Sequence, residues 1–134
     1  MISYLIDTDR IIDFLKGDKK TVEKLTSLLD EGLAVSVISL AELYEGVYGS
    51  DNPERRMKGL NDFLTSVNVL EVNNEINEIS GVFGKKRAAL RKDGKLIDNF
   101  DLLIAATCLH YDLTLITNNT QHFERIEELN ILRF

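Results

Sequence analysis

Short apolar runs alternate with amphipathic segments along this chain. Apolar side chains dominate residues 2–6, 34–38, 67–72 and 113–116, as in strands that are buried on both faces of a sheet. Residues 131–132 predict a short edge strand near the end of the chain. Between these runs, apolar residues recur three and four positions apart, which predicts helices with one buried face. The expected helices begin near Ile11, Thr21, Ser39, Pro53, Ile76 and Asn99.

Strands that alternate with helices predict a parallel sheet covered on both faces. We therefore expect an α/β fold of three layers, α/β/α, with a central, mostly parallel sheet of four to five strands. The length of 134 residues and the 44% hydrophobic content suit a single domain over residues 1–134. A polar turn is expected at residues 117–120, after the fourth strand.

The helix that begins near Asn99 organises the pattern, because its start is polar and its body is apolar. Phe100, Leu103, Ile104 and Thr107 share one helix face by their spacing. Asp98 or Asn99 can cap this helix. Asp101 falls in the first turn, where the helix dipole stabilises a carboxylate.

The charge of the chain limits the classes of function. The formal net charge is −6 and the sequence pI is about 4.9, which speaks against a nucleic-acid binder driven by bulk charge. A nuclease that recruits cations remains compatible with it. The single cysteine, Cys108, forbids an internal disulfide, and with the lack of a basic apolar leader it predicts a cytoplasmic protein. No apolar run reaches the roughly 18 residues of a membrane span, so no membrane partner is expected.

Polar residues follow the predicted strands at matching places. Asp7 ends the first strand, Glu42 lies one turn into the helix after the second, and Asp101 lies in the helix that leads to the fourth. Asn119 follows the fourth strand. In an open parallel sheet, ligands bind beyond the carboxyl ends of the strands. Clustered carboxylates repel one another unless a cation lies among them, and an oxygen-only ligand set suits Mg²⁺ or Mn²⁺.

These pieces together resemble the PIN-domain nucleases, in particular the VapC-type toxins of toxin–antitoxin pairs. The resemblance covers nearly the whole chain, and it is carried by the order and spacing of residues 5–8, 39–46, 101–106 and 115–119, with Phe123. It implies a PIN-like fold and a metal-dependent ribonuclease that hydrolyses single-stranded RNA, such as tRNA or mRNA. It also implies a homodimer and a cognate antitoxin that blocks the site.

The resemblance implies an acidic core of Asp7, Glu42 and Asp101. Asp7 and Asp101 would bind the principal Mg²⁺ or Mn²⁺, directly or through water, and Glu42, the third acid of the metal site, would hold a water or assist its deprotonation. Thr117 and Asn119 would position water or phosphate by hydrogen bonds. Members of the family often carry a fourth acid where Asn119 stands, so the occupancy of a second metal position stays open.

Each acid also has a plainer structural interpretation. Ser39 and Glu42 have the spacing of a capping box, as do Asp98 and Asp101. Asp7 can act only as a helix cap. Asp9 and Asp98 are expected to be capping or surface acids, with an outer-shell role for Asp98 left open.

Other polar and aromatic residues are expected to serve packing or solvation. Tyr44 and Tyr48 share a helix face and suit core or dimer contacts, His110 and His122 suit surface or packing roles, and Cys108 suits the core. One basic cluster is either a solvated helix face or a track for RNA phosphates. Its members are Lys85, Lys86, Arg87, Arg91, Lys92 and Lys95, which Arg55, Arg56 and Lys58 can extend.

Three other functions are open at this stage. Asp7 and Asp9 after a strand resemble the nucleophile motif of haloacid-dehalogenase-like phosphatases, although Ile11 stands where Thr or Val is usual. Length, acidity and strand–helix order also suit a non-enzymatic receiver-like signalling domain. That domain needs an aspartate at the end of the third strand, where this chain has Glu71. The third is a PIN fold with weak catalysis that acts through its partner.

Overall fold

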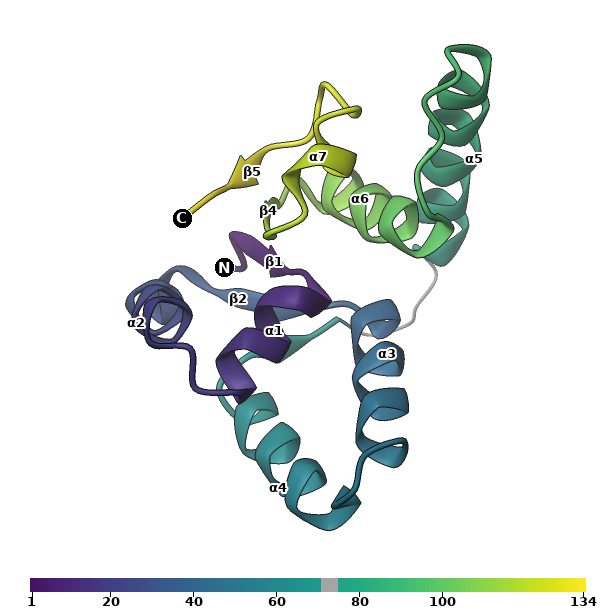
Figure 1. Cartoon of the computed structure of the whole chain (residues 1–134). Coiled ribbons are helices and arrows are strands. Elements are labelled where there is room, and N and C mark those ends of the chain that lie inside the picture. Colours follow the sequence, from purple (N-terminus) through teal and green to yellow (C-terminus); the bar gives the residue numbers. More distant parts are fainter. Residues whose placement is uncertain (71–74) are drawn as a thin grey trace.

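The computed structural model describes residues 1–70 and 75–134 and contains a sheet of five parallel strands (Figure 1). The strands are β1 (Tyr4–Ile6), β2 (Leu33–Val35), β3 (Asn68–Val69), β4 (Thr114–Ile116) and β5 (Ile131–Leu132). Their order is β3-β2-β1-β4-β5, and every neighbouring pair is parallel. The predicted α/β class is therefore confirmed, with five strands.

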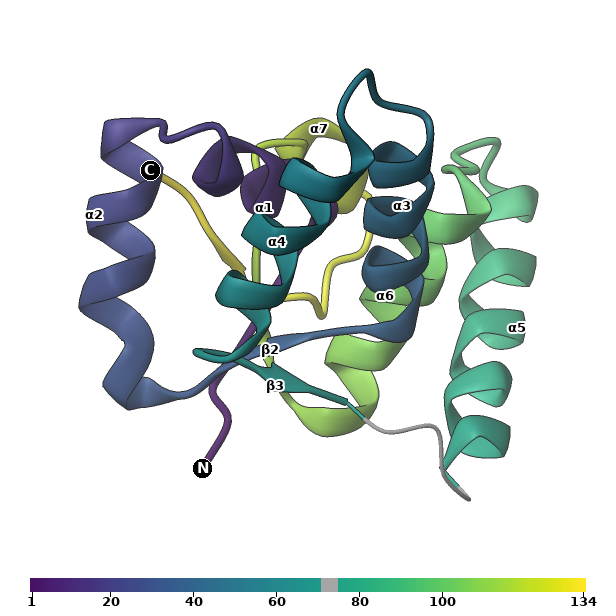
Figure 2. The same cartoon turned by 90° about the horizontal axis from the view of Figure 1, so that it is seen from below.

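Helices cover both faces of the sheet. They are α1 (Thr8–Leu15), α2 (Lys19–Leu28), α3 (Val37–Tyr48), α4 (Pro53–Leu64), α5 (Ile76–Lys92), α6 (Asn99–Tyr111) and α7 (Thr120–Phe123), with a 3-10 turn, η1 (Leu29–Glu31). Helices α1 to α4 lie on one side, and α5 to α7 lie on the other, with α5 outermost beside α6 (Figures 1 and 2). In the described part of the chain, no helix is long and apolar enough to cross a membrane.

Successive residues of each central strand point into different cores. Leu5 of β1 and Leu115 of β4 join the cluster that also contains Leu102 of α6. The next residues, Ile6 and Ile116, join the cluster on the opposite face, among the side chains of α1 to α4. Burial on both faces explains why the strands are apolar without alternation.

The second strand ends earlier than the apolar run predicts. Residues 34–38 were expected to form a strand, but β2 ends at Val35 and α3 starts at Val37. The reason is the hydroxyl of Ser36, which accepts a hydrogen bond from the backbone N–H of Ser39 at 3.1 Å and so caps α3. Ser39 therefore lies inside the helix instead of starting it.

Three other predictions differ from the structure: the extent of a strand, a short helix and the burial of one side chain. The strand expected at 67–72 is described only as Asn68–Val69, and residues 71–72 of that prediction lie outside the described residues. The short helix α7 forms where only a turn was predicted. Phe100, which was predicted to share one helix face with Ile104 and Thr107, is 54% exposed. It lies in the first turn of α6, and the first buried residue of this helix is Leu102.

The order in which strands are added to the sheet reverses between β1 and β4, while all strands stay parallel. From β1 the chain proceeds to β2 and β3 on one side, while β4 and β5 occupy the other side. Asp7 continues this pairing, because its N–H donates to the carbonyl of Ile116 at 2.9 Å. The residues that follow β1 and β4 thus meet at the switch point of the sheet, where ligands bind in folds of this kind.

Candidate active site

The carboxylate of Asp7 joins the ends of the two central strands. Its Oδ1 accepts a hydrogen bond from the N–H of Thr8 at 2.8 Å, and its Oδ2 accepts one from the hydroxyl of Thr117 at 2.7 Å. The Asp7 residue is only 5% exposed. The helix-cap interpretation is therefore right for one oxygen, while the other is held from across the sheet.

Asp101 is tied to this pair through Asn119. The side-chain Nδ2 of Asn119 lies 3.4 Å from Oδ2 of Asp101, and the N–H of Asn119 donates to the hydroxyl oxygen of Thr117 at 3.0 Å. The cap of α6 is Asp98, which accepts from the N–H groups of Phe100 and Asp101. Asp98 thus supplies the cap, and the carboxylate of Asp101 instead contacts Asn119 and His122 at the rim of the sheet.

Glu42 of α3 is connected to the same rim through Thr8, the first residue of α1. Its Oε1 accepts a hydrogen bond from the hydroxyl of Thr8 at 2.8 Å. The hydroxyls of Thr8 and Ser39 are 2.9 Å apart. The capping-box interpretation of Glu42 is wrong, because the residue that caps α3 is Ser36. Glu42 is thus linked to Asp7 through a single residue, Thr8.

Two residues that the sequence analysis did not include in the site also lie at the rim. The Nδ1 atom of His122 lies 3.1 Å from Nδ2 of Asn119 and 3.5 Å from Oδ2 of Asp101, so this histidine is not a remote surface residue. Asp9 is also not a simple surface acid, since its Oδ2 accepts from the N–H of Asn118 at 3.1 Å. A forecast of α7 would have brought His122 close to Asn119, one helical turn away.

The acids of the rim disfavour one another's charge. Burial, with the nearby charges of Asp9 and Asp101, raises the pKa of Asp7 to about 7, against the lowering effect of its hydrogen bonds from Thr117 and Thr8. Burial is also the largest cause of the raised pKa values of Asp9 and Asp101. The site therefore concentrates negative charge that a bound cation would neutralise.

The donor chemistry fits a hydrated divalent cation better than a closed cage. Within residues 1–70 and 75–134, no three side chains of His, Cys, Asp or Glu converge closely enough to hold one metal ion. Mg²⁺ usually keeps several waters and needs only one or two carboxylates. Asp7 and Asp101 are close enough for their charges to interact. Asp9 adds a buried oxygen, Oδ1, that has no hydrogen-bond partner in the described part of the chain.

The predicted basic cluster is partly engaged in structural contacts. Lys86 pairs with Glu128, and the Nε of Arg87 donates to Oδ1 of Asn99 at 3.0 Å. The other four cations of the cluster are exposed. These contacts connect α5 to the start of α6 and to the C-terminal segment, so at least two of the six cations have a structural role.

The remaining aromatic and thiol predictions have mixed outcomes. The rings of Tyr44 and Tyr48 stack with centroids 6.5 Å apart, and Tyr48 is 71% exposed, so it does not lie in the core of this chain. The core position of Cys108 is confirmed at 1% exposure.

Comparison with known proteins gives consistent matches over nearly the whole chain. The family model described as PIN domain matches residues 4–129. Ribonuclease VapC1 of Haemophilus influenzae (strain R2866) is 37% identical over 128 residues, which cover 94% of this chain and 93% of that protein. The tRNA(fMet)-specific endonuclease VapC of Shigella flexneri is 29% identical over 126 residues, with the same two coverages.

Solved structures agree with these matches. The crystal structure of VapBC2 from Rickettsia felis, bound to a DNA fragment from its promoter, has a TM-score of 0.90 at 30% identity. The alignment covers 100% of this chain and 99% of that one. VapBC-1 from nontypeable Haemophilus influenzae has a TM-score of 0.85 at 36% identity, with 98% and 97% covered.

The raised pKa of Asp7 predicts a pH-dependent effect of Asp7→Asn on stability in metal-free buffer. Between about pH 4 and 7, the unfolded chain has lost the Asp7 proton and the folded chain still holds it, so the wild type loses stability as pH rises through this window. The amide does not titrate. The variant should therefore gain stability relative to the wild type with rising pH, by up to about 4 kcal/mol for a shift of about three pH units.

Chemical denaturation with EDTA present, at several pH values from 4 to 8, measures this difference. Glu23→Gln, at an exposed position of α2, is the control and should show no such trend. A difference between Asp7→Asn and the wild type that stays constant over this range would contradict the prediction.

Proposed function

This chain belongs to the PIN-domain family and to its VapC ribonucleases, and we propose that it hydrolyses single-stranded RNA with Mg²⁺ or Mn²⁺ held by Asp7 and Asp101. The resemblance inferred from the sequence is thus confirmed, and the phosphatase and receiver alternatives are set aside. The observation that supports the proposed chemistry is the hydrogen-bonded line at the switch point, which brings acids from distant parts of the chain to one rim.

The bound metal would supply a Lewis acid for the phosphodiester and lower the pKa of a bound water. The chain contributes the placement of the groups around it. Thr117 fixes one oxygen of Asp7, so the carboxylate cannot rotate away from the rim. Asn119 holds Oδ2 of Asp101 in the same manner. Ligands that are positioned before binding lose less freedom when the cation enters.

Glu42 lies at a different place from the Asp7–Asp101 pair and takes a different role in the proposal. Its carboxylate, anchored by Thr8, would accept the proton of the attacking water or orient that water. The hydroxide would form a bond to phosphorus while the bond to the ribose oxygen breaks, and that leaving oxygen would take a proton from water or from protonated Glu42. No serine or histidine nucleophile is needed in this scheme.

We also propose that the RNase works in the cytoplasm as a homodimer and is controlled by a cognate antitoxin. The antitoxin is supported by the similar chains found in VapBC structures, a family of toxin–antitoxin systems. The homodimer follows from the family resemblance alone, and the cytoplasmic location rests on the single cysteine, which cannot form an internal disulfide. The relative from Shigella flexneri is a tRNA(fMet)-specific endonuclease, which makes tRNA the first substrate to test, with mRNA second.

Removal of either central carboxylate should stop RNA cleavage and leave the fold intact. Asp7→Asn and Asp101→Asn keep the shape of each side chain and remove its negative charge. We expect each variant to lose at least about 100-fold in cleavage rate, since even groups that only orient a metal ligand contribute 10- to 100-fold. A single-turnover assay on fluorescent RNA measures the loss, with Glu23→Gln as the acid-to-amide control. Cleavage at the wild-type rate in both variants would exclude the proposed site.

Metal removal should have the same effect as the loss of Asp101. Cleavage should vanish in excess EDTA and return with Mg²⁺ or Mn²⁺, because the cation is needed to activate the water. Titration calorimetry with Mn²⁺ should show binding to the wild type and at least tenfold weaker binding to Asp101→Asn. Cleavage that persists in EDTA would instead point to a metal-free mechanism.

A gene next to the coding sequence should encode the antitoxin. We expect a short upstream open reading frame with a DNA-binding N-terminal part, whose product inhibits cleavage when it is co-purified. Light scattering of the purified RNase should give twice the mass of 15.2 kDa. A monomer, or a neighbouring product that leaves cleavage unchanged, would contradict the corresponding part of the proposal.

A further inference from the structure

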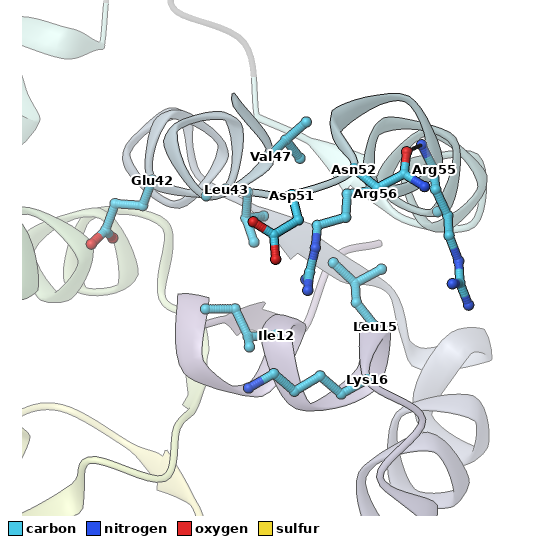
Figure 3. A pocket seen from close by; sticks show the side chains of 12 residues that line it. Ile12, Leu15, Lys16, Glu42, Leu43, Val47, Asp51, Asn52, Arg55 and Arg56 are labelled. Atoms are coloured by element: carbon cyan, nitrogen blue, oxygen red, sulfur yellow. Dashed lines mark hydrogen bonds between the residues drawn. The ribbon is translucent and has the colours of Figure 1, made fainter. Parts of the chain in front are cut away.

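A groove lies beside Glu42, between α1 on one side and α3 with the start of α4 on the other (Figure 3). Its volume is about 570 Å³, which is within the range of sites that hold small organic groups. Glu42 stands at the α3 side of this groove, so the groove and the proposed catalytic rim share a residue. When a phosphate of single-stranded RNA lies at the rim, the next nucleotide lies beside the rim, within reach of this groove.

The floor of the groove is apolar although it is open to solvent. Ile12 and Leu15 of α1 are 39% and 38% exposed, and both line the groove. Leu43 and Val47 of α3 line the opposite side of the groove and are buried (Figure 3). An exposed apolar surface next to a reaction centre favours a ligand with a flat apolar face.

The edge of the groove carries cations. Arg55 and Arg56 of α4 and Lys16 after α1 line it, and the guanidinium of Arg56 points toward α1 in Figure 3. In the described ranges, none of these three cations forms an ion pair. Glu42 and Asp51 line the same groove, so its three cations exceed its two acids by one. In a chain of net charge −6, this local excess of positive charge complements a phosphate backbone.

We propose that this groove binds one unpaired nucleobase of the RNA, next to the bond that is cleaved. The base lies between the guanidinium plane of Arg56 and the side chains of Ile12 and Leu15, while Arg55 and Lys16 contact the adjacent phosphates. Bases of single-stranded RNA stack on guanidinium planes in this manner, and paired bases cannot enter such a slot. The inference rests on the proposed RNase function.

The same features argue against a protein helix as the occupant. A helix that binds in a groove needs a row of apolar anchors over two turns, matched by a long apolar surface. The longer apolar surface lies in a neighbouring groove, which shares Leu15 and is also lined by Phe14 and Leu29. The groove beside Glu42 exposes two apolar side chains of α1, and charged side chains border it. The exposed apolar surface beside Glu42 is closer in size to one nucleobase than to the row of anchors on a helix.

Fluorescence anisotropy in EDTA, which prevents cleavage in the proposed mechanism, tests the inference with the full-length wild type. The probes are a labelled single-stranded RNA of eight nucleotides, its duplex, and a set of copies that each lack one base. We expect one abasic position to raise the Kd of the wild type by about tenfold, the contribution of one stacked base. The same position should change the Kd of Arg56→Ala less than twofold, because the stacking partner is already absent.

Matched substitutions separate stacking from charge. Arg56→Lys keeps the positive charge and loses the plane, so it should bind the intact RNA nearly as weakly as Arg56→Ala. Lys58→Ala removes a cation from the same helix at a position outside the groove and should bind within about twofold of the wild type. Ile12→Ala, at an exposed position that tolerates truncation, should weaken the abasic effect without unfolding the chain.

The inference would be overturned by equal affinity of the wild type for single-stranded and duplex RNA, by wild-type affinity of both Arg56 variants, or by an abasic effect that survives in Arg56→Ala. It would also be overturned if Ile12→Glu lost antitoxin binding and kept its RNA affinity, because the groove would then belong to a protein. Cleavage by the wild type with Mn²⁺ is measured separately. If it is absent, the proposed RNase function fails, whereas intact cleavage with an unchanged KM in Arg56→Ala refutes only the groove.

Discussion

The hydrogen bond from Thr117 to Asp7 is the contact on which the rest of the site depends. It joins the ends of two neighbouring parallel strands at the point where the strand order reverses, and it holds a carboxylate that is almost fully buried. Burial of an acid beside other acids opposes its ionisation, and two hydrogen bonds do not offset that effect, because the pKa of Asp7 is raised to about 7. An apolar or amide side chain at position 7 would give the fold a higher stability than the buried carboxylate does. The position is understandable if a cation replaces the lost solvation.

From this contact, the other groups of the site follow in one connected line. Glu42 bonds to Thr8, whose N–H bonds to Asp7. On the other side, Thr117 is followed by Asn119 and Asp101. These residues come from the ends of strands and the first turns of helices, which packing holds in place. Positions on such rigid elements are defined more sharply than positions on long loops, which explains how segments more than 90 residues apart in sequence can form one site.

The sequence was sufficient for the sheet and for the positions of Asp7 and Asp101 at the ends of a strand and a helix, because both depend on local patterns. Buried strands read as continuous apolar runs, and Asp7 and Asp101 stand at strand and helix ends that such runs delimit. The capping of α3 was assigned to the wrong serine, since Ser36 and Ser39 are equally good caps and only the end of β2 decides between them. His122 and Asp9 were left out of the predicted site because their neighbours come from other segments: Asp101 for the histidine, and the turn after β4 for the aspartate. The groove beside Glu42 has no sequence signature, since its walls come from three helices.

Asn119 illustrates why a neutral residue suits this rim. Asp7, Asp9 and Asp101 already have raised pKa values, so a further carboxylate near Asp101 would increase the repulsion within the rim. The amide nitrogen of Asn119 instead lies within hydrogen-bonding distance of Asp101 and of Nδ1 of His122. An amide has both a donor and an acceptor, so its oxygen remains available while its nitrogen holds the carboxylate. The amide therefore positions the carboxylate of Asp101 in a way that an ionised acid could not. A carboxylate has no hydrogen to donate to another carboxylate unless one of the two is protonated.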